Sequence, residues 1–548
     1  MFVGLCPVVA GLHRCGTQSN ERRIDLPGTR PCARVSGDAR LVRAVPLYMS
    51  QSNPAGEPVS PVASSIPSAV VAPSHHPTGA VPSIDSANGS GIESINASKP
   101  RRRRAPRVWR RFVVFWRDRS PAQQLTLGFL SWVLIGWLAL CLPWAQSVPV
   151  GPLDNLFGVV SAISTTGLAT VPTGDSYTFF GELVHLILFQ LGGIGYMTLS
   201  SFILLATGRA IGRSREGILK VGFTLPHYFR LDRFIKHVIV FTLVCEALGA
   251  AVLYVVFTLA GKEDALWSAI FHSVSAFATA GFGLYSNSLE DFRHSLPVNL
   301  TIGLLCYAGA IGFIVVQDVW YSFRLRERML TFTSKIILWM TAILLLFGTA
   351  VFYFVEPSIS ELGAGDRLMA AVFQVMSASS TAGFNTIPVG PLGLAALWVI
   401  VIVMLIGASP SGTGGGIKTT SASALLAAVI STIRGRTQVS LFGNEIPQRR
   451  LNSAAAAATL YLMLVSTGVL ALLCVLESPD FVKVLFEVTS AIGTVGLSMG
   501  LTGELGTAGK WVVIGLMFVG RVGPLTLGLA LFAARRNEDA RSADDLAT

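Results

Sequence analysis

The hydrophobic positions of the chain gather after residue 123, where long apolar runs alternate with shorter amphipathic ones. A run of about 20 residues can cross a bilayer as a helix. The pattern predicts such spans near 124–144, 182–206, 234–259, 299–322, 334–356, 393–432, 453–476 and 509–534. A piece too short to cross falls between the two members of each pair, near 154–164, 265–277, 366–378 and 481–491. We therefore expect an all-α integral membrane protein with eight transmembrane helices and four re-entrant pore helices.

Each short piece runs into a sequence that recurs four times along the chain. The four stretches are SAISTTGL (161–168), SAFATAGF (275–282), SASSTAGF (377–384) and SAIGTVGL (490–497). All fit the pattern S-A-x-x-T-x-G-[LF], and their glycines are 114, 102 and 113 residues apart. Chance does not place four such octamers at near-equal intervals. The pattern predicts a fourfold internal repeat of helix, half-helix, loop and helix.

The recurring stretch offers backbone oxygens at membrane depth. Extended backbone is tolerated there only where it lines protein or water. Four such loops around one axis would form rings of carbonyl oxygens that replace the hydration shell of a cation. Helix packing through small residues is the alternative, but it does not explain four patches in one register. The predicted selectivity filter comprises Thr165, Thr166, Gly167, Leu168, Thr279, Ala280, Gly281, Phe282, Thr381, Ala382, Gly383, Phe384, Thr494, Val495, Gly496 and Leu497.

A glycine-rich break interrupts the second long span of each repeat. The breaks are QLGGIG (190–195), GAIG (309–312), GASPSGTGGGIKTT (407–420) and GRVGPLT (520–526). The third holds Pro410 and five glycines between 407 and 416, which cannot form a continuous helix. It predicts a loop inside the membrane below the filter, where a gate would act. A phosphate-binding loop is the alternative, but that motif needs Gly directly before Lys, and Ile417 precedes Lys418.

Arg521 is a cation within the last apolar span. Intramembrane charges are costly and usually functional. An arginine that snorkels from a helix end is the alternative, but apolar residues continue on both sides of Arg521. Its register places it level with the third-repeat break, facing the permeation path. The predicted gate therefore comprises Ser409, Ser411, Gly412, Thr413, Gly414, Gly415, Gly416, Lys418 and Arg521.

Charge predicts the orientation of the chain. Only 13% of the residues are charged, against about 25% in soluble proteins, and the net charge is +11. Lys and Arg gather in the candidate inner loops, whereas 145–180 has none, so both termini should be cytoplasmic. The basic run 99–111 favours a lipid-facing anchor over a nucleic-acid signal. The seven Cys and eight His form no disulfide or zinc pattern.

Composition and repeat register set the expected boundaries. Residues 1–99 are rich in Pro, Ser, Ala and Gly, which is typical of disorder. The prediction is a disordered, basic cytoplasmic region over 1–120, four repeats and a cytoplasmic tail. The repeats are 121–208, 209–323, 324–435, which holds the gating loop, and 436–535, and the tail is 536–548.

Over roughly 120–535 the chain resembles the Trk/Ktr/HKT superfamily of potassium transporters, most closely the KtrB-type membrane subunit. The resemblance rests on the four octamers, on QLGGIG, on SPSGTGGGIKTT and on the Arg521 segment. It implies four membrane–pore–membrane repeats, K⁺ bound at the filter residues, an intramembrane gating loop and no organic cofactor. It also implies a homodimer in the cell membrane, with a separate cytosolic nucleotide-binding regulatory subunit of the KtrA/TrkA type.

The resemblance makes the chain a K⁺ uptake subunit rather than an enzyme, and it allows for Na⁺ stimulation. A Na⁺-permeable or Na⁺/K⁺ cotransporting member of the superfamily remains an alternative. An alternating-access carrier would have two pseudo-symmetric halves, which the fourfold octamer disfavours. An ATP-driven pump would need a Walker motif or a cytosolic domain with a phosphorylated aspartate, and neither is apparent.

Overall fold

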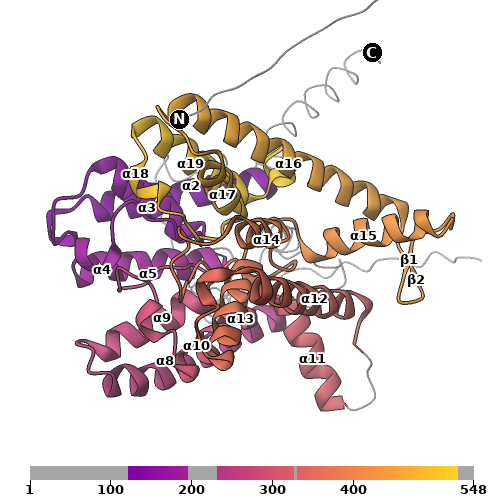
Figure 1. The fold of residues 1–548 in the computed structure, drawn as a ribbon, viewed down its shortest axis with the longest axis horizontal. Coiled ribbons are helices and arrows are strands. Elements are labelled where there is room, and N and C mark those ends of the chain that lie inside the picture. The colour runs from indigo at the N-terminus through magenta and orange to yellow at the C-terminus, as the bar shows by residue number, and fades with distance from the viewer. Residues whose placement is uncertain (1–120, 196–230, 326–329, 529–548) are drawn as a thin grey trace, which may run out of the picture. The chain divides into compact units, whose positions relative to one another are not determined.

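The computed structural model describes residues 121–195, 231–325 and 330–528. These residues belong to the second of the two units into which the chain divides, Pro100–Thr548. The whole predicted N-terminal region (1–120), the end of the first predicted repeat, the start of the second, the end of the fourth and the C-terminal tail lie outside the described residues. The hydrophobic pattern is confirmed as a helical fold with several long apolar helices (Figure 1).

Four helices are long and apolar enough to cross a membrane by themselves. They are 20 to 29 residues long and match the first predicted span of each repeat. Large apolar side chains remain exposed along them, as lipid-facing helices require. These helices are α2 (Pro121–Leu140), α8 (Leu231–Leu259), α12 (Phe332–Val355) and α16 (Gln448–Val475).

A shorter helix follows each of these four. The short helices have 12 to 17 residues, and their last two turns are buried. Pro at the first position of α3 and the side chain of Asp480 ahead of α17 suit helix starts. The short pieces expected from the sequence are therefore helices: α3 (Pro152–Ile163), α9 (Ala265–Phe277), α13 (Ala364–Ser380) and α17 (Phe481–Gly493).

The second helix of each repeat ends at its glycine-rich break. Glycines with positive φ lie at or just after these ends, namely Gly195 (+85°), Gly312 (+93°) and Gly523 (+86°), and the third helix ends one residue before Ile406. Glycine adopts this conformation without steric cost. The helices concerned are α5 (Phe179–Ile194), α10 (Leu296–Ala310), α14 (Leu394–Leu405) and α19 (Thr507–Val522).

These breaks lie where the glycine-rich stretches predict them, and they shorten the second helices. Within the described residues, four helices meet the length and composition of a span, or five if α10 and α11 (Phe313–Leu325) count as one. Those two helices are bent by 99° at the break. The chain after Gly195 up to residue 230 lies outside the described residues. Within the described residues, each second helix ends at a stretch rich in glycine, which disfavours a continuous helix.

Short elements connect the helices. A two-stranded antiparallel hairpin joins α15 (Thr419–Ile433) to α16, with Ser440 paired to Glu445 and Leu441 to Asn444. The remaining elements are α4 (Thr173–Ser176), α18 (Leu501–Glu504), η1 (Pro143–Ala145), η2 (Glu290–Phe292), η3 (Pro357–Ile359), β1 (Ser440–Leu441) and β2 (Asn444–Glu445).

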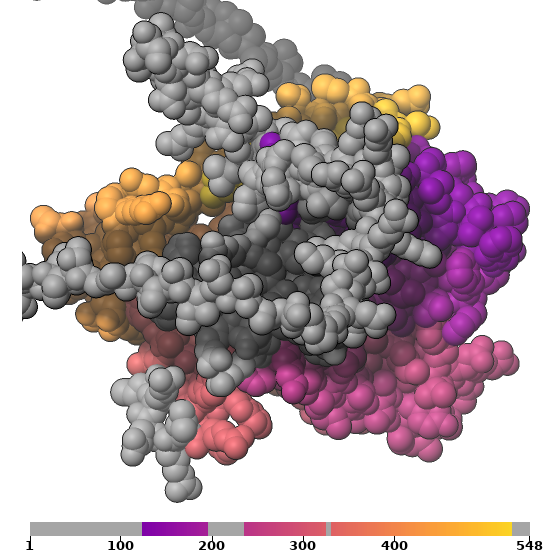
Figure 2. Space-filling view, turned by 180° about the vertical axis from the view of Figure 1, so that it is seen from behind, coloured from indigo at the N-terminus to yellow at the C-terminus, as the bar shows by residue number. Residues whose placement is uncertain are grey.

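The described helices form four segments, each with one long helix, the short helix that follows it and the second helix that ends at a glycine-rich break. The four segments follow one another around a common centre. Figure 1 shows them in order from indigo through magenta and orange to gold, and the opposite view (Figure 2) shows the same cyclic order. Polar contacts link neighbours, such as Trp267 Nε1 to Glu182 Oε2 at 2.5 Å and Asn385 Nδ2 to Glu290 Oε1 at 2.8 Å. The first segment therefore contacts the second, and the second contacts the third.

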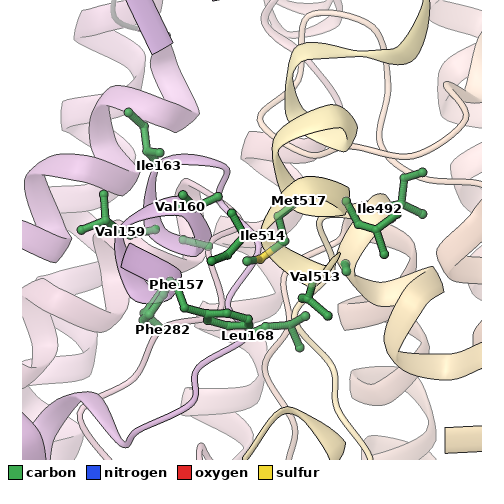
Figure 3. Close-up of a cluster of buried hydrophobic side chains, with 14 of the residues drawn as sticks. Phe157, Val159, Val160, Ile163, Leu168, Phe282, Ile492, Val513, Ile514 and Met517 are labelled. Atoms are coloured by element: carbon green, nitrogen blue, oxygen red, sulfur yellow. The ribbon is translucent and has the colours of Figure 1, made fainter. Parts of the chain in front are cut away.

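The first and last segments pack against each other and close the circle. Phe157 and Ile163 of α3 share one hydrophobic cluster with Val513 and Met517 of α19, as Figure 3 shows. Lys510 Nζ lies 2.5 Å from Asp154 Oδ1 across the same contact. This packing makes a closed ring of four segments from a single chain.

Candidate functional site

Each short helix ends in the same turn, which the octamer encodes. The N–H groups of the octamer's fifth and sixth residues donate to the carbonyls of its second and first residues, at 2.8–3.3 Å. This is the Schellman arrangement, in which one residue adopts the left-handed conformation. A threonine holds that place in all four turns, with φ between +49° and +57°. These threonines, the threonine ring, are Thr165, Thr279, Thr381 and Thr494.

The left-handed threonines are unusual, because a β-branched residue at positive φ is a genuine outlier. Such outliers persist where the surrounding structure holds them, and they cluster at functional sites. Four identical outliers at the same position of one motif indicate a shared structural requirement. Two residues after each of these threonines, the octamer glycine touches the loop of the next segment, so the four loops meet.

The octamer glycines form a second ring, the glycine ring. All have positive φ, from +71° to +94°. A Cβ atom added to any of them would collide with a carbonyl oxygen of the next segment, at 2.5 to 2.7 Å for Gly167, Gly281 and Gly383. The contacts run once around the circle, as Gly167 to Ala280, Gly281 to Ala382, Gly383 to Val495 and Gly496 to Thr166. The four loops therefore meet in a closed ring in which only glycine fits.

The last residue of each octamer has a buried side chain. Leu168, Phe282, Phe384 and Leu497 are 0–2% exposed and belong to the hydrophobic clusters. Their side chains hold the loops against the protein around them. The carbonyls of Thr166, Ala280, Ala382 and Val495, by contrast, lie at the glycine ring.

The glycine-rich stretch after α14 forms a loop, residues 406–418, whose two ends touch. A Cβ atom on Gly407 would lie 2.7 Å from the Gly416 Cα, and the Ala408 N–H donates to the Gly415 carbonyl at 3.1 Å. The Ile417 N–H donates to the Leu405 carbonyl. The loop is thus a closed excursion between α14 and α15, as its glycines and Pro410 predict.

The tip of the 406–418 loop contacts all four members of the threonine ring. Thr413 accepts a hydrogen bond from Thr165 Oγ1 at 3.3 Å and shares one with Thr279 Oγ1 at 2.9 Å. Cβ atoms added to Gly414 and Gly415 would press on the hydroxyl oxygens of Thr381 and Thr494, respectively. One loop from one segment therefore contacts the whole threonine ring.

The same loop is joined by backbone hydrogen bonds to the break between α10 and α11. The Ser409 N–H donates to the Ala310 carbonyl and the Thr413 N–H to the Gly309 carbonyl, both at 3.1 Å. Phe313 N–H donates in return to the Ser411 carbonyl at 3.4 Å. The break in the second segment thus holds the loop of the third.

Two cations flank the loop. Lys418 Nζ donates to the Gly414 carbonyl at 2.7 Å. Arg521 Nη1 lies 2.9 Å from Thr165 Oγ1 and also contacts the Thr413 carbonyl, while its Nη2 contacts the Gly192 carbonyl. The planar guanidinium therefore joins the threonine ring, the 406–418 loop and the break after α5. The predicted gate residues come together around this point.

A cavity of about 920 Å³ adjoins the loop, and Gly414 and Gly415 line it together with Lys418, Arg521 and Arg450. Because the same two glycines touch the threonine ring, one layer of backbone separates the cavity from that ring. Within the described ranges no three His, Cys, Asp or Glu side chains form a metal-binding group. The oxygens at the centre are carbonyls and hydroxyls, which suit a partly dehydrated monovalent cation.

Sequence reasoning missed three kinds of residue at this centre. Gly192, Gly309 and Ala310 contribute only backbone groups, so their glycine-rich motifs gave no indication of their partners. Ser161 and Ser490 accept hydrogen bonds from the Gly167 and Gly496 N–H groups at 3.1 and 3.0 Å. The octamer's invariant first serine was the available signal for that role. The third is Glu487 on α17, whose carboxyl group contacts the chain just after the loop of the fourth segment.

The fold and this centre define a helical, multi-pass membrane protein of the cation-transport class. The chain belongs to the TrkH family of cation transport proteins, which matches residues 129–542. This is a family of transporters and not of enzymes.

Curated relatives and a solved structure agree with this assignment. The chain is 36% identical to the Ktr system potassium uptake protein B of Vibrio alginolyticus, over 74% of this chain and 90% of the relative. It is 31% identical to the potassium/sodium uptake protein NtpJ of Enterococcus hirae, over 77% of this chain and 95% of the relative. It shares the fold of the potassium transporter TrkH from Vibrio parahaemolyticus, with a TM-score of 0.57 and 21% identity over 79% of this chain and 86% of that structure.

Proposed function

We propose that the chain is the ion-translocating subunit of a Trk/Ktr-type system that takes up K⁺ across the cell membrane. The observation that carries the proposal is the closed glycine ring, with one loop set against all four members of the threonine ring. The names of the relatives, which are potassium uptake proteins, point to the same ion. The glycine and threonine rings then form the selectivity filter, whose inward oxygens replace the water around K⁺.

The 406–418 loop acts as the gate in this proposal. Its tip closes the inner end of the filter, and Arg521 holds the tip through the Thr413 carbonyl. A guanidinium at this place also repels cations. Opening requires the tip to leave the threonine ring, which the loop's glycines permit because they add no side chain to be moved.

The remaining parts of the proposal follow the family pattern. The repeats 121–208, 209–323, 324–435 and 436–535 each contribute two membrane-crossing segments and one re-entrant pore helix, with both termini in the cytoplasm. The chain functions as a homodimer with a separate nucleotide-binding regulatory subunit of the KtrA/TrkA type, in keeping with the word "system" in the relatives' names. No nucleic acid or organic cofactor takes part.

Expression in a cell that lacks its own K⁺ uptake tests the function directly. The chain, alone and with a Ktr-type regulatory subunit, should restore growth at low external K⁺ and accumulate ⁸⁶Rb⁺ as a tracer. Absence of uptake by correctly inserted protein, with the regulator present, would contradict the proposal.

A Na⁺-permeable or Na⁺/K⁺ cotransporting protein is the second candidate. The name of NtpJ, a potassium/sodium uptake protein, favours it. The two candidates differ in whether Na⁺ enters the cell with K⁺ or only stimulates K⁺ entry. Measuring ²²Na⁺ uptake alongside ⁸⁶Rb⁺ uptake separates them.

Gly167→Ser should raise Na⁺ permeation relative to K⁺. The backbone of Gly167 has a φ of +94°, and a Cβ atom there would lie 2.6 Å from the Ala280 carbonyl oxygen. The added side chain displaces that carbonyl and distorts the spacing of oxygens that suits K⁺. We expect the K⁺/Na⁺ preference to fall by about tenfold, which corresponds to roughly 1.4 kcal/mol. An unchanged ratio in a well-expressed variant would show that Gly167 does not form the filter.

Removing the loop should increase K⁺ flux and weaken its dependence on the regulator. Gly407 and Gly416 are in contact, so residues 408–415 can be deleted with little change in the distance between α14 and α15. The smaller deletion of 411–416 tests the tip. Faster uptake by correctly inserted protein is the expected result. If the variants insert normally and transport nothing, the loop is part of the conduction path rather than a gate.

A further inference from the structure

Glu487 is a buried acidic side chain that the filter and gate do not use. It lies on the short helix α17 and is 0% exposed. It is nine residues before the ring glycine Gly496. The residues at this register in the other segments are Gly158, His272 and Gln374, so the fourth segment alone has a carboxyl group there.

The carboxyl group is hydrogen-bonded to the chain that leaves the fourth filter loop. Ser498 Oγ lies 2.9 Å from Glu487 Oε2 and 3.2 Å from Oε1. The Thr502 hydroxyl contacts Oε1 and lies 3.3 Å from Ser498 Oγ. Glu487 therefore joins helix α17 to the segment 498–502.

These contacts enclose the filter residues of the fourth segment. Glu487 precedes them on the helix and Ser498 follows Leu497 directly, so the hydrogen bonds tie together the two ends of the stretch 488–497. That stretch contains Thr494 and Gly496, which occupy left-handed conformations. Such conformations persist only where the surrounding structure holds them.

The other three segments have no equivalent tie among the described residues. In the first segment the two positions are Gly158 and Ala169, which have no polar side chain. In the second, Gly283 takes the place of Ser498. In the third, both polar atoms of Gln374 are buried without a hydrogen-bond partner. Among the described residues, this link by side-chain hydrogen bonds between a short helix and the end of its filter loop is therefore found in the fourth segment alone.

We propose that Glu487 is a positioning residue for ion selection, because its hydrogen bonds to Ser498 and Thr502 fix the fourth loop of the filter. The inference rests on the proposed function. It adds a residue that fixes the conformation of the filter loop contributed by the fourth segment. Glu487 acts through the loop and does not touch the ion. Loosening its hydrogen bonds should therefore weaken K⁺ binding and K⁺/Na⁺ discrimination more than the maximal rate.

The test compares Glu487→Gln, Ser498→Ala and Thr502→Val in ⁸⁶Rb⁺ uptake with K⁺ and Na⁺ as competitors. Each variant should raise the KM for K⁺ by about tenfold, as expected for a lost hydrogen bond to a buried carboxyl group, with a smaller change in Vmax. Na⁺ should compete better in all three. Thr489→Val is the matched control, because Thr489 is equally buried on α17 but donates only to the Leu485 carbonyl of its own helix.

Each outcome decides between two explanations. Parallel changes in the three variants, with Thr489→Val like the wild type, support positioning. A change in Glu487→Gln alone would overturn the proposal, because charge and not the hydrogen bonds would then be responsible. Unchanged KM and selectivity in all three would also overturn it. Failure of the wild-type chain to take up K⁺ would instead contradict the proposed function.

Discussion

Replacement of Gly496 by alanine should lower the rate of K⁺ uptake by about a hundredfold while leaving the protein folded. Gly496 has a φ of +93°, and a Cβ atom there would press on the Thr166 carbonyl oxygen and lie 3.1 Å from the Gly167 Cα. Both neighbours are backbone, so neither can rotate away. Relief of the conflict requires the first and fourth loops to move apart. Strain on the order of 3 kcal/mol at the ring would lower the rate by roughly a hundredfold.

Gly500→Ala is the control for this prediction. Gly500 lies four residues further along the same loop with nearly the same φ, +94°, but a Cβ atom added there meets nothing within 4 Å. Its substitution adds the conformational cost alone, about 1–2 kcal/mol. Uptake by Gly500→Ala should remain near the wild-type rate. Normal uptake by Gly496→Ala at equal surface expression would show that the ring does not conduct.

Removal of the Arg521 charge should produce the second large effect, a faster K⁺ flux. The guanidinium joins Thr165, the Thr413 carbonyl and the Gly192 carbonyl, so it holds the loop at the threonine ring and places a positive charge beside the proposed ion path. A unit charge about 4 Å away opposes a cation by roughly 4 kcal/mol at an effective dielectric constant of 20. Arg521→Gln should therefore increase K⁺ uptake by about tenfold or more. The increase stops where another step of transport becomes rate-limiting.

Arg521→Lys separates the two contributions of this residue. Lysine keeps the charge but cannot form the planar fork that bridges the first and third segments. Because the observed contacts are hydrogen bonds to separate segments, we expect Arg521→Lys to increase flux as well. A slow Lys variant with a fast Gln variant would assign the barrier to charge alone. Arg434→Gln, at an exposed position at the end of α15, is the control. Wild-type flux in Arg521→Gln would make the residue purely structural.

The repeated features of the fold could be predicted from the sequence. The short helices and the helix breaks follow from local rules, because glycine and proline act where they stand in the chain. The octamer likewise predicted the four turns, whose left-handed threonines occupy one position of the motif. The glycine-rich stretches predicted where the second spans are broken, but not the angle of a bend such as the one after Ala310.

Register placed Arg521 level with the 406–418 loop, which it contacts, but the other contacts between segments could not be predicted. The 406–418 loop is held by the backbone of Gly309 and Ala310, and backbone hydrogen bonds leave no pattern in side-chain chemistry. Motif register places Leu168 and its three equivalents in the filter stretch, but it does not show that their side chains pack into the hydrophobic clusters. The pairing of Glu487 with Ser498 depends on how the fourth loop returns to its helix.

The closure of the ring within a single chain, through α3 and α19, affects how this protein can change over generations. In a pore built from four identical subunits, one codon change alters all four quarters together. Here one codon change alters a single quarter, and the other three keep their geometry. Ion preference can therefore shift in small inherited steps, and each quarter can acquire a duty that the others do not share.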